Sequence, residues 1–437
     1  MKPRRSYVLM FLAALAAAGL AATAQAQQKE IKVGVIYDYT GPLAAGGSIA
    51  AGIGTKAAID MINERGGVEG YRIKAIYADA QSKADVAINE MTRLLDQEKV
   101  DVIMGLFSSA HCVPIAQQVD ARKKFMWANV CVASSVFKDK NLHYVFRAQV
   151  HSDQFGEASC TFLAENAKSR LGKEVKDLKV AIIYEDGPYG AGVAMGNEAK
   201  CKALGIQIVI KEGYSATTPD LSSLVTKLRR ARADVILHTG YNPDITLFWR
   251  QAREQGLKWS ALIGHGAGYG QYDKLREALG KDADYIYDVD PVGAQLLDSK
   301  TLKPGLGAVT AEMVKRYVAE IKDRKVDEIP PHVSMGFNQA WIFFTDVLPR
   351  AIKKYGGIDP EALRKAALET DIPVGGTIQG YGVKFFAPGT PMSGQNERSS
   401  PVVMQFIGGD TKVVWPAAIK TADPVLPLPK GHTYSLQ

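Results

Sequence analysis

The stretch VDVIMGLFSSAHCVP, residues 100–114, decides the fold, because an apolar run ends there abruptly in small residues. Residues 100–107 are nearly all apolar, which is typical of a strand buried on both faces of a parallel sheet. Residues 108–110 predict a turn, and apolar periodicity over residues 115–121 predicts a helix after it. The start of such a helix leaves backbone N–H groups free, so together with the Ser109 hydroxyl it can bind a carboxylate. The alternative is that the small residues only let strand and helix pack.

The N-terminal residues of the chain have the pattern of an export signal. Lys2, Arg4 and Arg5 precede an apolar run over residues 8–22, and Ala24-Gln25-Ala26 is a suitable cleavage site. We therefore expect residues 1–26 to be a signal peptide and the mature protein to be periplasmic, without a lipid anchor. Its removal takes three of the 53 Lys and Arg and none of the 46 Asp and Glu, leaving a charge of about +4 with no basic block. This balance does not favour nucleic-acid binding.

The chain has four cysteines, and export would place them in an oxidising compartment. They form no CxxC and have no Cys/His ligand spacing, so we expect no metal site. Because each pair falls within one expected lobe, we predict disulfides Cys112–Cys131 and Cys160–Cys201. Free buried thiols are an equally open alternative.

Strand and helix patterns alternate along the chain in two successive units. This order predicts an α/β protein with two doubly wound parallel sheets, each covered by helices on both faces. The expected strands are 31–38, 72–79, 100–107 and 125–130 in the first unit, and 178–184, 207–211, 234–238 and 261–264 in the second. Later segments are too small for a third domain, so we assign residues 29–149 plus about 291–401 to lobe 1 and residues 150–290 plus about 402–437 to lobe 2. A ligand is expected where the carboxyl ends of the two sheets face each other.

The segment DVILHTGYNPDITLFWRQAREQGLK, residues 234–258, resembles the Leu/Ile/Val-binding proteins of bacterial branched-chain amino-acid importers. Thr40-Gly41-Pro42, the GLFSS run and YEDGPYGAG at residues 184–192 match other motifs of that family, along essentially the whole mature chain. The resemblance implies a type I periplasmic-binding-protein fold, with two Rossmann-like lobes joined by three hinge crossings. It also implies closure of the lobes on a ligand that is delivered to an ATP-driven permease.

The resemblance also implies a ligand site. Ser109 and the Ala110 N–H receive a carboxylate, with help from the backbone of residues 130–132, while Tyr189 and Tyr241 close from the second lobe. The expected lining therefore includes Val130 and Val132. Alternatively, Tyr189 packs a helix start and Tyr241 anchors a loop.

Two departures from the family bear on the ligand. Gly266 stands where amino-acid-binding members carry a Glu for the ligand ammonium, and a buried ammonium without a counter-charge is costly. Gly46 replaces an aromatic residue of the first loop, which predicts a wider pocket. We therefore expect an aromatic or hydroxyaromatic acid that lacks an α-amine. A branched-chain or other hydrophobic amino acid is the alternative if an acid reaches the site, and the candidates are Glu185, Asp186 and Asp244. Two histidines at strand ends could contact a carboxylate or phenol, or be core or rim residues: His111 and His265.

An enzyme is not expected. Gly190-x-Gly192 follows a strand, but position 195 is Met, and GxSxG, HExxH and Walker A motifs are absent from the sequence. We expect no cofactor, a monomer, and an ABC permease as partner. A ligand sensor for a signalling partner is the alternative of another class.

Overall fold

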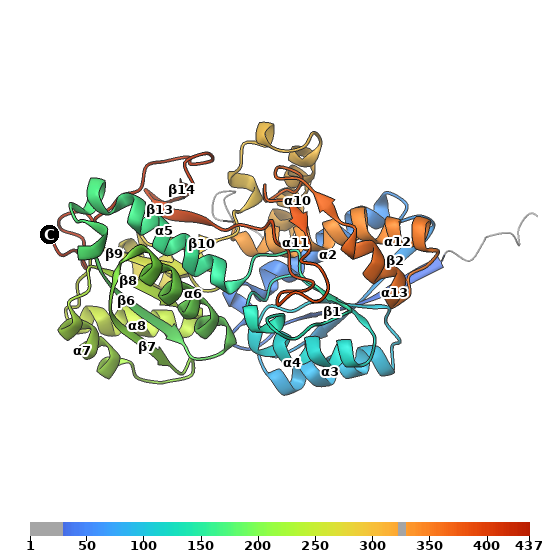
Figure 1. Cartoon of the computed structure of the whole chain (residues 1–437), viewed down its shortest axis with the longest axis horizontal. Helices are drawn as coiled ribbons and strands as arrows, with labels where there is room; N and C mark the ends of the chain where they lie inside the picture. Colours follow the sequence, from blue (N-terminus) through green and yellow to red (C-terminus); the bar gives the residue numbers. More distant parts are fainter. Residues whose placement is uncertain (1–28, 322–328) are drawn as a thin grey trace, which may run out of the picture.

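Two lobes lie side by side in the computed structural model, which describes residues 29–321 and 329–437 (Figure 1). The predicted signal peptide lies outside these residues. Among them, no helix is long and apolar enough to cross a membrane.

Lobe 1 is built on a five-stranded parallel sheet in the order β2-β1-β3-β4-β5. The strands are β1 (Lys29–Tyr37), β2 (Tyr71–Asp79), β3 (Val102–Gly105), β4 (Phe125–Ala128) and β5 (Val145–Phe146). Every residue of the central strands β3 and β4 is buried, as the continuous apolar runs predicted. Helices from two separate parts of the chain cover this sheet: α2 (Ile49–Glu64), α3 (Ala84–Asp96), α4 (Ser109–Ala121), α10 (Leu306–Glu320), α11 (Pro331–Ile342), α12 (Leu348–Tyr355) and α13 (Pro360–Leu368).

After lobe 2 the chain returns to lobe 1, where α11 packs along α2. The hydroxyl of Thr55 donates to the carbonyl of Gly336 at 3.1 Å, inside this helix pair. Every residue of α11 is buried, so the helix is a core element of the lobe rather than a surface cover.

Lobe 2 contains a seven-stranded sheet in the order β14-β13-β10-β9-β8-β6-β7. Its strands are β6 (Lys179–Glu185), β7 (Gln207–Tyr214), β8 (Val235–Thr239), β9 (Ala261–His265), β10 (Tyr287–Asp290), β13 (Val402–Ile407) and β14 (Asp410–Trp415). Its helices are α5 (Ser152–Leu171), α6 (Pro188–Leu204), α7 (Ser222–Ala231), α8 (Asn242–Glu254) and α9 (Tyr272–Leu279). β6 to β10 run parallel, whereas β13 joins β10 antiparallel and β14 pairs with β13. The C-terminal tail packs on this lobe, where the ring of Tyr434 stacks on Trp259 at 4.5 Å between centroids.

Short elements complete the fold. They are the π turns η1 (Ala44–Ser48) and η8 (Phe343–Val347), the 3-10 turns η2 (Ser134–Val136), η3 (Val175–Asp177), η4 (Gly280–Ala283), η5 (Ala294–Leu296) and η6 (Ser299–Thr301), and the two-residue strands β11 (Asp371–Ile372) and β12 (Val383–Lys384).

The chain crosses between the lobes three times, which confirms the predicted fold class. The crossings follow β5, β10 and the segment that ends near residue 400. Arg147 in the first crossing is fully buried and donates from Nε to Gln395 Oε1 at 2.6 Å, in the third. We propose the predicted residue ranges as the boundaries of the two lobes.

Three elements do not follow from the apolar patterns of the sequence. Residues 144–150 form a strand only at Val145–Phe146, because the chain then turns into the crossing between the lobes. Residues 333–354 are not one regular helix, since the π turn η8 separates α11 from α12. β10 was not expected at all, because its sequence YDVD alternates with acids and lacks an apolar run.

The four cysteines are paired as predicted in this structure. Cys112 Sγ lies 2.07 Å from Cys131 Sγ, and Cys160 Sγ lies 2.08 Å from Cys201 Sγ. The first pair ties α4 to the segment after β4, and the second ties α5 to α6.

The disulfide pairing predicts the outcome of a thiol titration. Denatured mature protein without reductant should show no reactive thiol, whereas four thiols would contradict both bonds. The double variant C160S/C201S should lose stability, by roughly 4 kcal/mol at most for a loop of this length, because the unfolded chain gains conformational freedom. Urea unfolding measures this loss, and the wild type in reductant serves as the comparison.

Candidate functional site

A narrow cavity lies between the lobes, at the carboxyl ends of both sheets. It measures about 300 Å³, counted to its opening. Lobe 1 and lobe 2 contribute similar shares of the wall, namely Phe107, Ser109, Val130, Val132, His332 and Met335 on one side and Phe155, Tyr189, Tyr241, Gly266, Ala267 and Asp290 on the other. The lobes are therefore close together in this structure, and the cavity opens to solvent between them.

One end of the cavity is the start of α4. The Ser108 carbonyl accepts the Cys112 N–H at 3.0 Å, and within the described residues the N–H groups of Ser109 and Ala110 have no backbone or side-chain acceptor. The Ser109 hydroxyl oxygen accepts the Ala133 N–H at 3.1 Å and lines the cavity. Because the helix dipole adds positive potential here, this end suits an anion.

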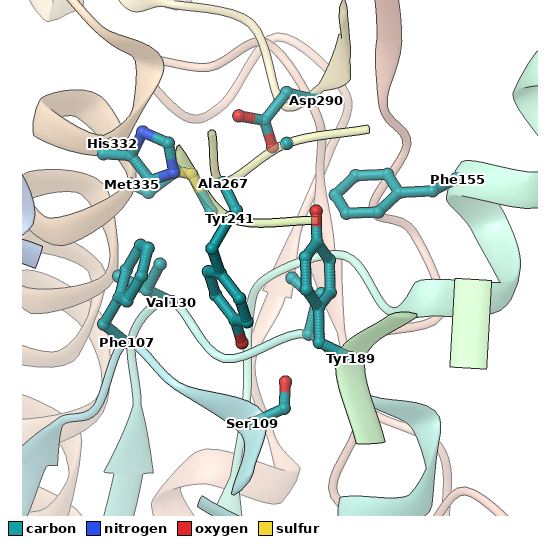
Figure 2. A pocket seen from close by; sticks show the side chains of 12 residues that line it. Phe107, Ser109, Val130, Phe155, Tyr189, Tyr241, Ala267, Asp290, His332 and Met335 are labelled. Carbon is teal, nitrogen blue, oxygen red and sulfur yellow. The ribbon is translucent and has the colours of Figure 1, made fainter. Parts of the chain in front are cut away.

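The middle of the cavity is walled by aromatic rings from both lobes (Figure 2). Tyr241 lies 6.3 Å from Phe107 and 5.5 Å from Tyr189, between ring centroids. Phe107 in turn lies 5.5 Å from the imidazole of His332. Such walls favour a flat apolar ligand body and exclude water from it.

The two tyrosine hydroxyls point to opposite ends of the cavity. Tyr189 donates to the carbonyl of His265, whereas the hydroxyl of Tyr241 points toward Ser109 (Figure 2). Burial raises the pKa of both tyrosines well above the usual value, so both are neutral.

The other end of the cavity carries Asp290, at the end of β10. Its side chain is 1% exposed. A Cβ placed on Gly266 would lie 3.3 Å from Asp290 Oδ1. A carboxyl group from β10 therefore lies beside the position where the family resemblance implies a glutamate. Burial, followed by the neighbouring Asp288 carboxylate, raises the pKa of Asp290 well above its usual range.

His332 on α11 borders the same end. Gln271 Nε2 donates to His332 Nδ1 at 2.9 Å, which leaves the ring proton on Nε2. Burial lowers the pKa of His332 to about 3, so the ring is neutral. Lobe 2 thus contacts lobe 1 through a hydrogen bond next to the cavity.

Most predicted site residues line this cavity. Those that do are Ser109, Val130, Val132, Tyr189, Tyr241 and Gly266. Ala110 and His111 instead line a larger outer cavity, about 1220 Å³ counted to its opening, on the other side of Tyr241. His111 is buried there, with Nδ1 3.6 Å from Asp38 Oδ1.

Two predicted residues lie elsewhere. His265 is a core histidine, because its Nε2 contacts Ser159 Oγ at 2.7 Å and its Nδ1 contacts Thr239 Oγ1 at 2.9 Å. Gly46 borders neither cavity, so the expected widening has no counterpart in the walls. A Cβ there would lie 3.0 Å from Asn242 Oδ1 of lobe 2.

The three acids considered as substitutes for the missing glutamate do not reach the inner cavity. Glu185 accepts the Gly187 and Gly190 N–H groups at 2.8 and 2.5 Å, at the start of α6. Asp244 accepts the Tyr241 N–H at 3.0 Å, at the start of α8. Asp186 is exposed. The acid that borders the cavity is Asp290, which the sequence analysis missed.

The residues that sequence reasoning missed come mostly from α5, β10 and α11. They are Phe107, Phe155, Ala267, Asp290, His332 and Met335. Phe107 is the last residue of the strand predicted over residues 100–107, and Ala267 closely follows the strand predicted over residues 261–264. Among the described residues, no group of three or more His, Cys, Asp or Glu is arranged to hold a metal ion.

Comparisons with known proteins agree with this geometry. The family model of periplasmic binding proteins matches residues 30–394. A Leu/Ile/Val-binding protein homolog 7 of Brucella abortus (strain 2308) is 35% identical over 417 residues, which cover 95% of this chain and 99% of the relative.

Two solved structures are similar in fold. A leucine-binding protein of Thermotoga maritima has a TM-score of 0.71 at 21% identity, covering 88% of this chain and 97% of its own. A solute-binding protein of an ABC transporter from R. palustris, in complex with 4-hydroxybenzoate, has a TM-score of 0.69 at 19% identity, covering 91% and 98%.

Neighbouring glycines in η1 give a matched pair of variants. Gly47 has φ +123°, and a Cβ there would lie 2.9 Å from the His332 ring, so G47A should lose roughly 1–3 kcal/mol of stability. G46A should lose less than about 1 kcal/mol, because Gly46 has an ordinary φ of −80° and the Asn242 side chain can move. Urea unfolding compares the two, and equal losses would contradict the contact between η1 and His332.

Proposed function

We propose that this chain, which belongs to the periplasmic binding protein family, captures a flat aromatic acid with a polar group at its far end. A hydroxyaromatic carboxylate is the preferred class. The observation that carries this proposal is the placement of Ser109 and Asp290 at opposite ends of an aromatic-walled cavity (Figure 2).

The family gives the general function. Its members related to the Leu/Ile/Val-binding proteins are solute-binding components of ABC transporters and act outside the cytoplasm. They are not enzymes, which confirms that part of the sequence prediction. We further propose a periplasmic monomer that closes on its ligand and delivers it to a permease.

The ligand orientation follows from the two ends. The start of α4 offers free N–H groups and the Ser109 hydroxyl to a carboxylate. The ligand ring would lie between Phe107, Tyr189 and Tyr241, where dispersion and burial of apolar area favour it. Its distal hydroxyl would face Asp290 in the closed state. Contacts with both lobes favour closure over opening.

An acid, Asp290, lies near Gly266, although Gly266 itself carries no side chain. The absence of a glutamate there no longer disfavours an ammonium group by itself. An α-amino acid, however, carries its carboxylate and ammonium on one carbon, so both must bind at the same end of a pocket. In this cavity the anion-binding end and the acid lie at opposite ends, with the tyrosines between them (Figure 2). Benzoates with a distal hydroxyl match that spacing better than leucine does.

The solved relatives include both ligand classes, a leucine-binding protein and a 4-hydroxybenzoate complex. Each resembles this chain in fold at about one-fifth identity, so neither decides its ligand.

A ligand panel tests the proposed class. Mature protein should be stabilised by hydroxybenzoates, and leucine, isoleucine and valine should have no effect. A ligand at a hundred times its Kd adds about 2.7 kcal/mol, which raises Tm by a few degrees. S109A should weaken binding roughly 10- to 100-fold, since a hydrogen bond to a charged group is lost. Stabilisation by the aliphatic amino acids alone would refute the proposal.

Two substitutions at Asp290 separate a hydroxyl from an ammonium as the group it meets. D290L should weaken binding of 4-hydroxybenzoate roughly 10- to 100-fold, because the ligand hydroxyl is left unpaired. D290N should cost clearly less, because the amide can still donate a hydrogen bond. If Asp290 were the counter-ion of an ammonium, both variants would lose affinity equally. Calorimetry of the two variants against the wild type gives the answer.

A further inference from the structure

Two buried carboxyl groups lie together behind the proposed ligand pocket. Asp288 and Asp290 are two residues apart on β10, so their side chains emerge on the same face of the sheet. Asp288 is 0% exposed and Asp290 is 1% exposed. A Cβ placed on Gly270 would lie 3.2 Å from Asp290 Oδ2 and 3.4 Å from Asp288 Oδ2. Both carboxyl groups therefore face the same small space.

These groups lack the partners that buried carboxylates normally have. Within the described residues, three of the four carboxyl oxygens have no hydrogen-bond partner in normal geometry. They are both oxygens of Asp288 and Oδ2 of Asp290. The Gly266 N–H, which donates to the Val289 carbonyl at 3.0 Å, lowers the pKa of Asp288 against the larger effect of burial. An unpaired charge in such a place is costly, so the pair cannot be doubly ionised.

Among residues 29–321 and 329–437, the surroundings of the pair supply no counter-charge. His332 on α11 is neutral, because burial lowers its pKa to about 3. Tyr189, Tyr269 and Tyr381 are the other titratable groups that interact with the pair, and burial raises the pKa of each. On the adjacent strands β13 and β9 the paired positions are apolar or glycine: Val402, Met404 and Gly264.

We infer that Asp288 and Asp290 share a proton, and that Asp288 is a positioning residue whose charge keeps this proton on Asp290. The Gly266 N–H favours the charge on Asp288, and the Asp288 charge in turn favours the proton on Asp290. The far end of the pocket then presents a hydrogen-bond donor instead of an anion. This inference rests on the proposed function, because it explains why the site accepts a hydroxyl oxygen.

The affinity for the ligand should fall as the pH rises. A ligand hydroxyl that accepts from protonated Asp290 binds fully below the pKa of that carboxyl in the ligand-free protein. Above it, affinity falls tenfold per pH unit, since the proton must be restored on binding. Removing the Asp288 charge lowers the pKa of Asp290, so the decline begins at lower pH.

Calorimetric titration with 4-hydroxybenzoate between pH 5.5 and 8.5 tests the inference. In D288N the midpoint of affinity loss should lie at least one pH unit below that of the wild type. Benzoate, which has no distal hydroxyl, should show no such shift in either protein. D101N is a control, because Asp101 is a partly buried acid whose pKa burial also raises, and it lies directly before β3, away from the cavity. Matching profiles for wild type and D288N, or a shift shared by benzoate, would overturn the inference.

A measurement without ligand separates this inference from the ligand class. A proton held only in the folded state makes the folding equilibrium constant fall up to tenfold per pH unit above the unfolded pKa of about 4. Either carboxyl alone would still hold the proton in the folded state, so the double variant D288N/D290N should flatten the pH dependence of urea unfolding between pH 5 and 8. If the pH dependence of unfolding flattens but no aromatic acid binds, the shared proton is supported and only the proposed ligand class is refuted. An unchanged slope would refute the shared proton, whatever the ligand.

Discussion

The contact on which the site depends is aromatic and crosses between the lobes. Tyr241 at the start of α8 lies between Phe107 at the end of β3 and Tyr189 at the start of α6. Each ring follows the carboxyl end of a parallel strand, where open α/β sheets place ligands. Beside the three crossings, these rings and the Gln271–His332 hydrogen bond hold the two lobes together at the cavity. A ligand body between the rings replaces part of this contact and adds its own.

The sequence predicted the parts of the site that follow strands with clear apolar runs. Ser109, Val130 and Tyr189 are such residues, and each follows a strand that is buried throughout or over most of its length. Asp290 was not predicted, because the β10 sequence has acids at alternate positions and so lacks the hydrophobic pattern on which strand prediction depends. His332 and Met335 escaped for another reason. They lie on a helix that returns to lobe 1 from far along the chain, and no local pattern indicates which wall it completes.

The relation between Gly266 and Asp290 shows how a site can keep a chemical group while changing its source. The loop after β9 lacks an acid, and the next strand supplies one from its last residue. The change of source also changes the direction of approach. The carboxyl group of Asp290 lies opposite the start of α4, across the tyrosines, so in the proposed function it meets the far end of the ligand. Comparison of aligned positions alone would have missed this acid.

Arg147 links the wall of the pocket to the hinge. Its Nη1 donates to the carbonyls of Cys131 and Ala133 at 2.8 and 3.0 Å, on both sides of Val132 in the cavity wall. Its Nε bonds Gln395, whose own Nε2 donates to the Gln149 carbonyl at 2.6 Å. The wall and two of the three crossings thus form one continuous bonded unit. In kinetic terms, we expect hinge bending and ligand departure to be coupled, so that the residence time of the ligand depends on the stiffness of a buried segment outside the cavity wall.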